Sequence, residues 1–224
     1  MDEIKIIDLK RTILEDNDAD AELLRHELKE KGIFLINLMS SPGSGKTTTL
    51  LALARELKGK ANFAVMEADI DSDVDAKTMM SAGVACVQLH TGGMCHLDAD
   101  MTRQGIKAMG NIRDSIVVLE NIGNLVCPAE FDTGAHKKVA ILSITEGDDK
   151  PIKYPLMFSV ADLVIINKID TIEYFDFDIE KCKNNIHNLN PKAEIILASS
   201  KTGEGIDKIA KYILREYKSW SEQK

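Results

Sequence analysis

The chain has 224 residues, which is enough for one sizeable core in one or two domains. Hydrophobic residues make up 44% and charged residues 29%, as is usual for a globular protein. A formal net charge of −8 without a basic cluster argues against nucleic acid as a partner. Because no apolar run approaches the roughly 20 residues of a membrane span and the N-terminus lacks a signal peptide, we expect a cytoplasmic protein without a membrane partner.

The first element that we expect is a helix over about residues 9–31. Its apolar side chains recur at helical spacing among many charges, and Gly32 follows as a suitable C-terminal residue. Asn17 and Asp18 mark the point where this helix could be interrupted. We interpret this segment as an N-terminal helical extension that packs on the main domain.

Seven apolar segments follow, and we expect each to be a strand. They cover residues 33–39, 63–66, 85–89, 115–119, 139–143, 163–166 and 195–197, and helical patterns such as 47–57 and 206–217 lie between most of them or at the C-terminus. Strands and helices that alternate in this way predict an α/β fold, with a mostly parallel central sheet and helices on both faces. Without a repeat or a linker, we expect residues 1–224 to form a single domain.

The segment Ser40–Thr47 lies between the first strand and the next helix. It matches the phosphate-loop pattern G-x-x-x-x-G-K-S/T except that Ser40 stands where the first glycine is expected. In this pattern the lysine reaches the β- and γ-phosphates and the hydroxyl of Thr47 binds Mg²⁺. A glycine-rich turn without a ligand is the alternative, which the strand–loop–helix context disfavours. The residues that we expect to bind phosphates are Gly43, Ser44, Gly45, Lys46, Thr47 and Thr48.

Asn167-Lys168-Ile169-Asp170 follows the strand 163–166 and matches the guanine-reading pattern N-K-x-D. Asp170 would accept hydrogen bonds from the guanine N1 and N2 groups, which adenine does not offer, while Asn167 would face N7 and Lys168 would cover the base. As an isolated tetrapeptide the motif is more often a solvated turn, but here it follows a phosphate loop. The second base-contact loop that we expect is Ser199, Ser200 and Lys201. Together the two motifs predict a P-loop GTPase.

Acidic residues follow two of the predicted strands. Asp69 is a candidate for binding Mg²⁺ or for positioning water, and Asp75 is a second candidate. Glu120 ends an apolar strand, as a Walker-B acid does, and Gly123 could reach the γ-phosphate with its N–H group. We therefore expect Mg²⁺ at Thr47, Asp69 and Glu120. The residues that we expect to act in hydrolysis are Lys46, Asp69, Asp75 and Glu120.

Cys95, His96 and Cys127 are the candidate ligands for a second metal. Two thiolates and an imidazole suit Zn²⁺ or Ni²⁺, although three ligands are one short of a closed tetrahedral site. Either a coordination position stays open or a second chain contributes. The alternative is that these are ordinary thiols beside a surface histidine, because no Cys-x-x-Cys motif supports the site.

The order of the motifs resembles HypB, a SIMIBI-class family of nickel-incorporation GTPases that act on hydrogenase. The resemblance spans nearly the whole chain. The segments that carry it are Ser40–Thr47, Glu67-Ala68-Asp69, Thr91-Gly92 with Cys95-His96-Leu97-Asp98-Ala99, Glu120–Leu125 with Cys127-Pro128-Ala129, Thr145–Asp149 and Asn167–Asp170.

The resemblance implies a metallochaperone that uses GTP and Mg²⁺ and binds Ni²⁺ or Zn²⁺ at Cys95, His96 and Cys127. It further implies a GTP-favoured homodimer with that site at the subunit interface, and Lys153, which follows Thr145–Asp149, as a cross-subunit residue. The implied partners are hydrogenase maturation proteins and the hydrogenase large subunit. We expect slow turnover because no residue is an evident arginine finger.

Three alternatives stay open at this point. One is a non-catalytic factor that uses nucleotide only to assemble a complex. Another is the urease-type nickel-insertion GTPase, whose usual Cys-Pro-His motif is absent. The third is a P-loop kinase, against which Asn167–Asp170 argues.

Overall fold

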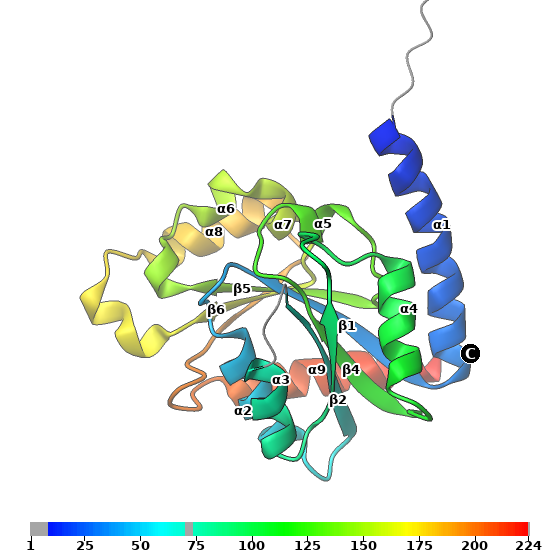
Figure 1. The fold of residues 1–224 in the computed structure, drawn as a ribbon. Coiled ribbons are helices and arrows are strands. Elements are labelled where there is room, and N and C mark those ends of the chain that lie inside the picture. The colour runs from blue at the N-terminus through cyan, green and yellow to red at the C-terminus, as the bar shows by residue number, and fades with distance from the viewer. Residues whose placement is uncertain (1–8, 70–73, 224) are drawn as a thin grey trace, which may run out of the picture.

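The structure, a computed structural model, describes residues 9–69 and 74–223, with side chains for all of these except 9–12, 69 and 74–76. In this part of the chain seven strands form one sheet with the order β3-β2-β4-β1-β5-β6-β7 (Figure 1). Every pair of neighbouring strands is parallel. The predicted α/β class is therefore confirmed.

All seven predicted strands occur, most of them one or two residues longer than expected. They are β1 (Ile33–Ser40), β2 (Asn62–Asp69), β3 (Ala85–His90), β4 (Ser115–Glu120), β5 (Lys137–Ser143), β6 (Leu163–Asn167) and β7 (Glu194–Leu197). The α-helices are α1 (Leu9–Glu30), α2 (Lys46–Leu57), α3 (Val74–Ser81), α4 (Ala99–Ala108), α5 (Cys127–Glu130), α6 (Lys150–Lys153), α7 (Pro155–Val160), α8 (Ile179–Leu189) and α9 (Ile206–Glu222). Two 3₁₀ turns are η1 (Ile144–Glu146) and η2 (Ile169–Tyr174).

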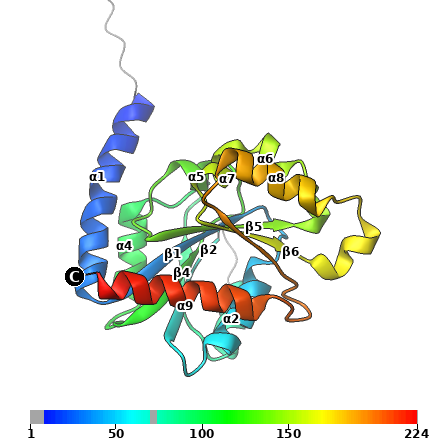
Figure 2. The same cartoon turned by 180° about the vertical axis from the view of Figure 1, so that it is seen from behind.

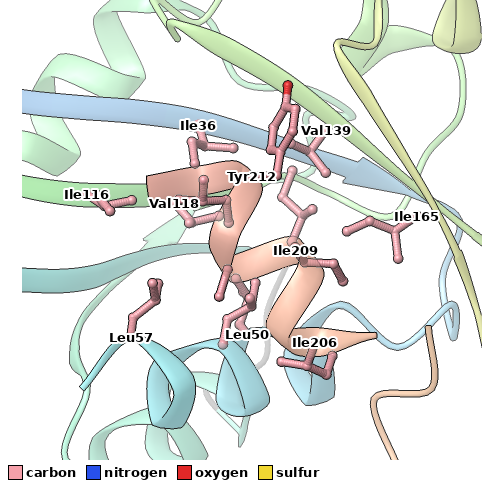
Figure 3. Close-up of a cluster of buried hydrophobic side chains, with 14 of the residues drawn as sticks. Ile36, Leu50, Leu57, Ile116, Val118, Val139, Ile165, Ile206, Ile209 and Tyr212 are labelled. Carbon is pink, nitrogen blue, oxygen red and sulfur yellow. The ribbon is translucent and has the colours of Figure 1, made fainter. Parts of the chain in front are cut away.

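One face of the sheet is covered by α2, α3 and α9. Figure 2 shows α9 crossing this face beside α2. Apolar side chains of both helices meet those of the central strands in the largest core cluster (Figure 3). Leu50 and Leu57 of α2 and Ile209 of α9 are fully buried there. The helix that follows the phosphate loop is thus fixed against the sheet by apolar burial.

The opposite face carries two groups of helices. Helices α1 and α4 pack over one half of the sheet, and α5, α7 and α8 pack over the other. All eight residues of β1, which lies between β4 and β5, are buried. A central strand that is covered on both faces explains why residues 33–39 read as one continuous apolar run.

Helix α1 runs without a break through Asn17 and Asp18, so the interruption considered from the sequence does not occur. The side chain of Asn17 is used for tertiary contacts, since its Nδ2 donates to Asp132 O and its Oδ1 accepts from Ala99 N, at 2.9 and 3.0 Å. Arg103 of α4 also fixes α1, because its guanidinium donates to Asp20 and Glu27 of that helix. No helix in the described part of the chain is long and apolar enough to cross a membrane.

The sheet topology places the predicted nucleotide-binding segments at one edge of the sheet, where the parallel strands have their carboxyl ends. The chain leaves β1, forms the strands on one side of it, and then returns to form β5, β6 and β7 on the other side. Ligands of open α/β sheets bind at the carboxyl ends of strands next to such a reversal. The carboxyl ends of β1, β2, β4 and β6 all lie at this edge.

Candidate functional site

The phosphate loop ends in a left-handed turn at Gly45, which has φ +98° and directly precedes α2. A Cβ at this position would lie 2.6 Å from Asn167 Nδ2, so glycine is required by both backbone conformation and space. The first N–H groups of α2 are left for a ligand, because no side chain caps this helix. The start of α2 therefore has the form of an anion site.

Side chains of the base motif hold the carbonyl side of the loop. Lys168 Nζ donates to Gly43 O at 2.7 Å, and Asn167 Nδ2 donates to Ser44 O at 2.9 Å. With these carbonyl groups turned toward the base motif, the loop can present its N–H groups to phosphates on the other side. The two motifs that were identified separately in the sequence form one structural unit.

Ser40, which departs from the glycine pattern, has a specific role in the loop. Its buried hydroxyl accepts hydrogen bonds from Ser44 Oγ at 2.7 Å and from Lys46 Nζ at 3.2 Å, and it donates to Ser41 O at 2.8 Å. The serine thus gives the Lys46 ammonium a partner within the protein. A glycine could not supply this contact.

A cavity of about 620 Å³, which we call the phosphate cavity, lies beside this loop. The side chains of Thr47 and Glu120 meet at it, with Thr47 Oγ1 donating to Glu120 Oε1 at 3.1 Å. Glu120 is only 2% exposed. The lining residues are Pro42, Gly43, Gly45, Lys46, Thr47, Thr48, Glu67, Ala68, Glu120, Asn121, Ile122, Gly123 and Lys168.

The segment after Glu120 is fixed against the centre of the sheet. Asn121 is fully buried, its Nδ2 donates to Asn37 Oδ1 at 3.0 Å, and its backbone N donates to Leu38 O at 2.9 Å. Gly123 lies so close to Pro42 that a Cβ would be 2.9–3.1 Å from three of its atoms. Gly123 therefore lies directly against the phosphate loop, and its contact with a γ-phosphate stays a prediction.

Two of the expected catalytic carboxylates cannot be placed. Asp69 is the last residue of β2 and Asp75 lies in α3, but both side chains are outside the described residues. Sequence reasoning missed Glu67, which is 2% exposed, pairs in register with Glu120 on the neighbouring strand and lines the phosphate cavity. Its sequence signal was an acidic residue inside an otherwise apolar strand. Because it lies two residues before Asp69, it is on the same face of the strand as Asp69.

A second cavity of about 160 Å³, the base cavity, adjoins the first. Asp170 is held there by Ser199, whose Oγ donates to Asp170 Oδ1 at 2.6 Å. Asn167 Oδ1 accepts from Ser200 N at 3.1 Å and from Ser200 Oγ at 3.0 Å. Residues of both expected base loops line this cavity, together with the end of the phosphate loop: Gly45, Thr48, Asn167, Lys168, Asp170, Thr171, Ser200 and Lys201.

The cysteine and histidine candidates lie at the surface near α5. Cys95 Sγ is 3.0 Å from Cys127 Sγ and 3.8 Å from His96 Nδ1. The hydrogen bond with Cys95, followed by burial, raises the pKa of Cys127, so a metal would have to displace a proton. Burial lowers the pKa of His96, which favours the neutral ring that metals bind.

The three side chains do not form a complete site within one chain. The His96 ring stacks on Phe131 with centroids 3.6 Å apart. Among the side chains that the structure describes, no group of three His, Cys, Asp or Glu is arranged to hold a metal ion. The two thiols are brought together, whereas the His96 ring lies against Phe131.

Comparison with known proteins agrees with these motifs. Residues 34–197 match the family model for the CobW/HypB/UreG nucleotide-binding domain. The hydrogenase maturation factor HypB of Escherichia coli is 42% identical over 207 residues, covering 92% of this chain and 71% of that protein. The probable hydrogenase maturation factor HypB of Methanocaldococcus jannaschii is 37% identical over 215 residues, covering 96% of this chain and 97% of that protein.

Solved structures give the same result. A crystal structure of HypB from Helicobacter pylori in complex with nickel superposes with a TM-score of 0.87 at 38% identity, covering 92% of this chain and 97% of that one. The crystal structure of the hydrogenase maturation factor HypB from Archaeoglobus fulgidus gives a TM-score of 0.84 at 35% identity, covering 91% of this chain and 100% of that one. The chain belongs to the HypB hydrogenase maturation factors, within the CobW/HypB/UreG family of P-loop nucleotide-binding proteins.

Proposed function

We propose that this chain is a GTP-hydrolysing metallochaperone that binds nickel and delivers it during maturation of nickel–iron hydrogenase, with GTP favouring a homodimer. The observation that carries the proposal is the segment 120–127. At its start Glu120 is bonded to Thr47 of the phosphate loop, and at its end Cys127 contacts Cys95. A change at the nucleotide can therefore move a metal ligand seven residues away.

The residues around the phosphate cavity fit the chemistry of GTP hydrolysis. Lys46 and the N–H groups at the start of α2 would hold the phosphates. The oxygen donors of Thr47 and Glu120 suit Mg²⁺, and Asp69 ends the neighbouring strand. When bound, Mg²⁺ would neutralise charge on the phosphates. Positioning of the attacking water falls to Asp69 or Asp75 in this proposal.

Turnover without a partner should be slow. The described lining of the phosphate cavity contains no arginine. Arg103 is held by Asp20 and Glu27 between α1 and α4 and does not serve as an arginine finger in its own chain. Without such a cation, charge that develops on the phosphates lacks a major source of stabilisation.

Guanine selection rests on the base cavity. One carboxylate oxygen of Asp170 is held by Ser199, which leaves the other for the N1 and N2 groups of guanine. Adenine would leave that carboxylate without a donor, at a cost of about 1–3 kcal/mol. The chain should therefore bind GTP in preference to ATP.

The metal-binding part of the proposal involves a second copy of the chain. Cys95, His96 and Cys127 supply an incomplete ligand set, and Cys95 is exposed. Two copies that meet at this surface would bring four thiols together, which suits Ni²⁺ or Zn²⁺. The nickel complex of the Helicobacter pylori relative supports nickel as the cargo.

Titration of Ni²⁺ into the GTP-bound and the GDP-bound protein tests the switch. Coupling of this kind is typically 5–150-fold in affinity and must act equally in both directions. Cys127→Ser should lose Ni²⁺ binding but keep GTP binding, and Lys46→Ala should lose the nucleotide effect. Equal Ni²⁺ affinities in the two nucleotide states would refute the proposal.

The alternative of a non-catalytic assembly factor makes a different prediction. Purified protein would then bind GTP and dimerise without releasing phosphate. Turnover that disappears in Lys46→Ala would exclude this alternative.

A further inference from the structure

Thr49 of α2 has a polar contact that its position in a helix does not require. Its side chain is fully buried, and its Oγ1 lies 2.7 Å from Gly45 O and 2.6 Å from Ser200 Oγ. A buried helical threonine is normally satisfied by the carbonyl group four residues earlier, which here is Gly45 O. The second contact, to a hydroxyl 151 residues later in the chain, joins the phosphate loop to the base loop.

The hydroxyl protons allow these hydrogen bonds to run in one direction from Thr49 through Ser200 to Asn167. Thr49 and Ser200 have one hydroxyl proton each, and Asn167 Oδ1 can only accept. If Ser200 donates to Asn167 Oδ1, then Thr49 must donate to Ser200. Gly45 O is still satisfied in this arrangement, because the backbone N of Thr49 donates to it at 2.9 Å.

The contacts close a ring that starts and ends on adjacent carbonyl groups of the phosphate loop. Gly45 O accepts from the backbone N of Thr49, the Thr49 hydroxyl contacts Ser200, Ser200 contacts Asn167, and Asn167 Nδ2 donates back to the loop at Ser44 O. Both ends of the Asn167 carboxamide are thereby assigned. A flipped amide would place its oxygen against Ser44 O and its nitrogen against the donors of Ser200.

The orientation of this amide matters for a base. Asn167 Nδ2 carries two protons and uses one for Ser44 O, which leaves one in a residue that lines the base cavity. Guanine N7 is an acceptor. We propose that Thr49 is a positioning residue that, acting through Ser200, orients the Asn167 carboxamide to donate to N7. This inference rests on the proposed function, since it assumes that guanine occupies the base cavity.

The test compares GTP with 7-deaza-GTP, which lacks the N7 acceptor. One hydrogen bond of about 1 kcal/mol corresponds to about 5-fold in affinity, so the native chain should bind GTP about 5-fold more tightly. In Thr49→Val, which removes only the hydroxyl from a side chain of similar shape, this ratio should fall to about 1. Thr49→Ser should restore it.

Ser200→Ala provides a second route to the same result. It should also lower the ratio toward 1, with Ser200 N left as the donor to Asn167 Oδ1, and adding Thr49→Val should have no further effect, because both changes break one ring. This variant changes a loop residue rather than the buried helix, so the test survives if Thr49→Val fails to fold. The melting temperature of each variant without nucleotide checks that the fold is retained.

Several outcomes would overturn the inference. If Thr49→Val and Ser200→Ala weaken GTP and 7-deaza-GTP equally, the ring only supports the fold. If the native chain does not distinguish the two nucleotides, Asn167 does not donate to N7. A native chain that prefers ATP to GTP would instead refute the proposed function itself, so the two failures are distinguishable.

Discussion

His136 makes the stability of this protein sensitive to mild acid. Leu35 N donates to its Nδ1 at 3.0 Å, and the ring stacks on Phe34 and meets the edge of Trp220. Burial, followed by the charges of Arg25 and Lys29, lowers the pKa of His136 to about 4. Protonation at Nδ1 would also place the new proton against the N–H group of Leu35.

The size of the effect follows from the two pKa values. The unfolded chain protonates this ring near pH 6.5 and the folded chain near pH 4, so the unfolded state binds the proton first as the pH falls. The stabilisation is complete above about pH 6.5 and is lost between about 6.5 and 4. At pH 5.5 the loss should be about 1.4 kcal/mol, and the full loss is about 3 kcal/mol.

Urea unfolding of the native chain and of His136→Gln at pH 8 and pH 5.5 measures this loss. Trp220, the only tryptophan in the chain, packs on His136 and reports unfolding by fluorescence, and circular dichroism gives a second probe. Between the two pH values the native chain should lose about 1.4 kcal/mol more than the variant. Equal losses would show that His136 does not carry the effect.

Two further substitutions test other parts of the structure. Arg103→Ala should lower the free energy of unfolding by about 2 kcal/mol, because it removes a partly buried, hydrogen-bonded pairing of α4 with Asp20 on α1, and urea unfolding will show whether it does. An unchanged midpoint would contradict a structural role for this arginine. Gly123→Ala should weaken GTP binding about 10-fold or more, because the added methyl pushes Pro42 and its loop outward. The exposed loop can move at little cost, so thermal melting should change little, and unaltered GTP affinity would contradict the inferred contact.

Most of the fold could be predicted because two patterns are clear in this sequence: the continuous apolar runs of the strands and the helical spacing of apolar residues in the long helices. Strands buried on both faces, such as β1 and β6, appear as continuous apolar runs. The short helices α5, α6 and α7 were not identified individually, since four to six residues give too little periodicity. Such elements form because tertiary packing favours them.

The behaviour of polar residues was the hardest to predict. Asn17 reads as a helix breaker, yet its amide binds Asp132 and the start of α4 without interrupting the helix. Cys182 lies in the otherwise charged helix α8, and it is fully buried in the core. Glu67 was overlooked because its neighbour Asp69 fits the motif better. The partners of Asn17 come from distant segments, which one sequence does not reveal.

The sequence predicted which segments form the candidate site better than it predicted the hydrogen bonds between them. The phosphate loop and the base motif are identified by their spacing and their strand context. That Asn167 and Lys168 also bind loop carbonyl groups depends on the order of strands in the sheet, in which β1 and β6 are separated only by β5. Spacing along the chain does not contain that order.

The hydrogen bonds that Asn167 and Lys168 donate to the phosphate loop have a consequence for biosynthesis. Ser44 and Gly43 are bonded by side chains that follow them by 123 and 125 residues. At 5–20 residues per second, a ribosome needs about 6 to 25 s to make that stretch. During this interval the loop lacks the donors that hold its carbonyl groups, and the base cavity lacks its walls. A nascent chain should therefore acquire nucleotide only after β6 and the loop that follows β7 have emerged, so that nucleotide binding marks a chain in which every strand of the sheet has been made.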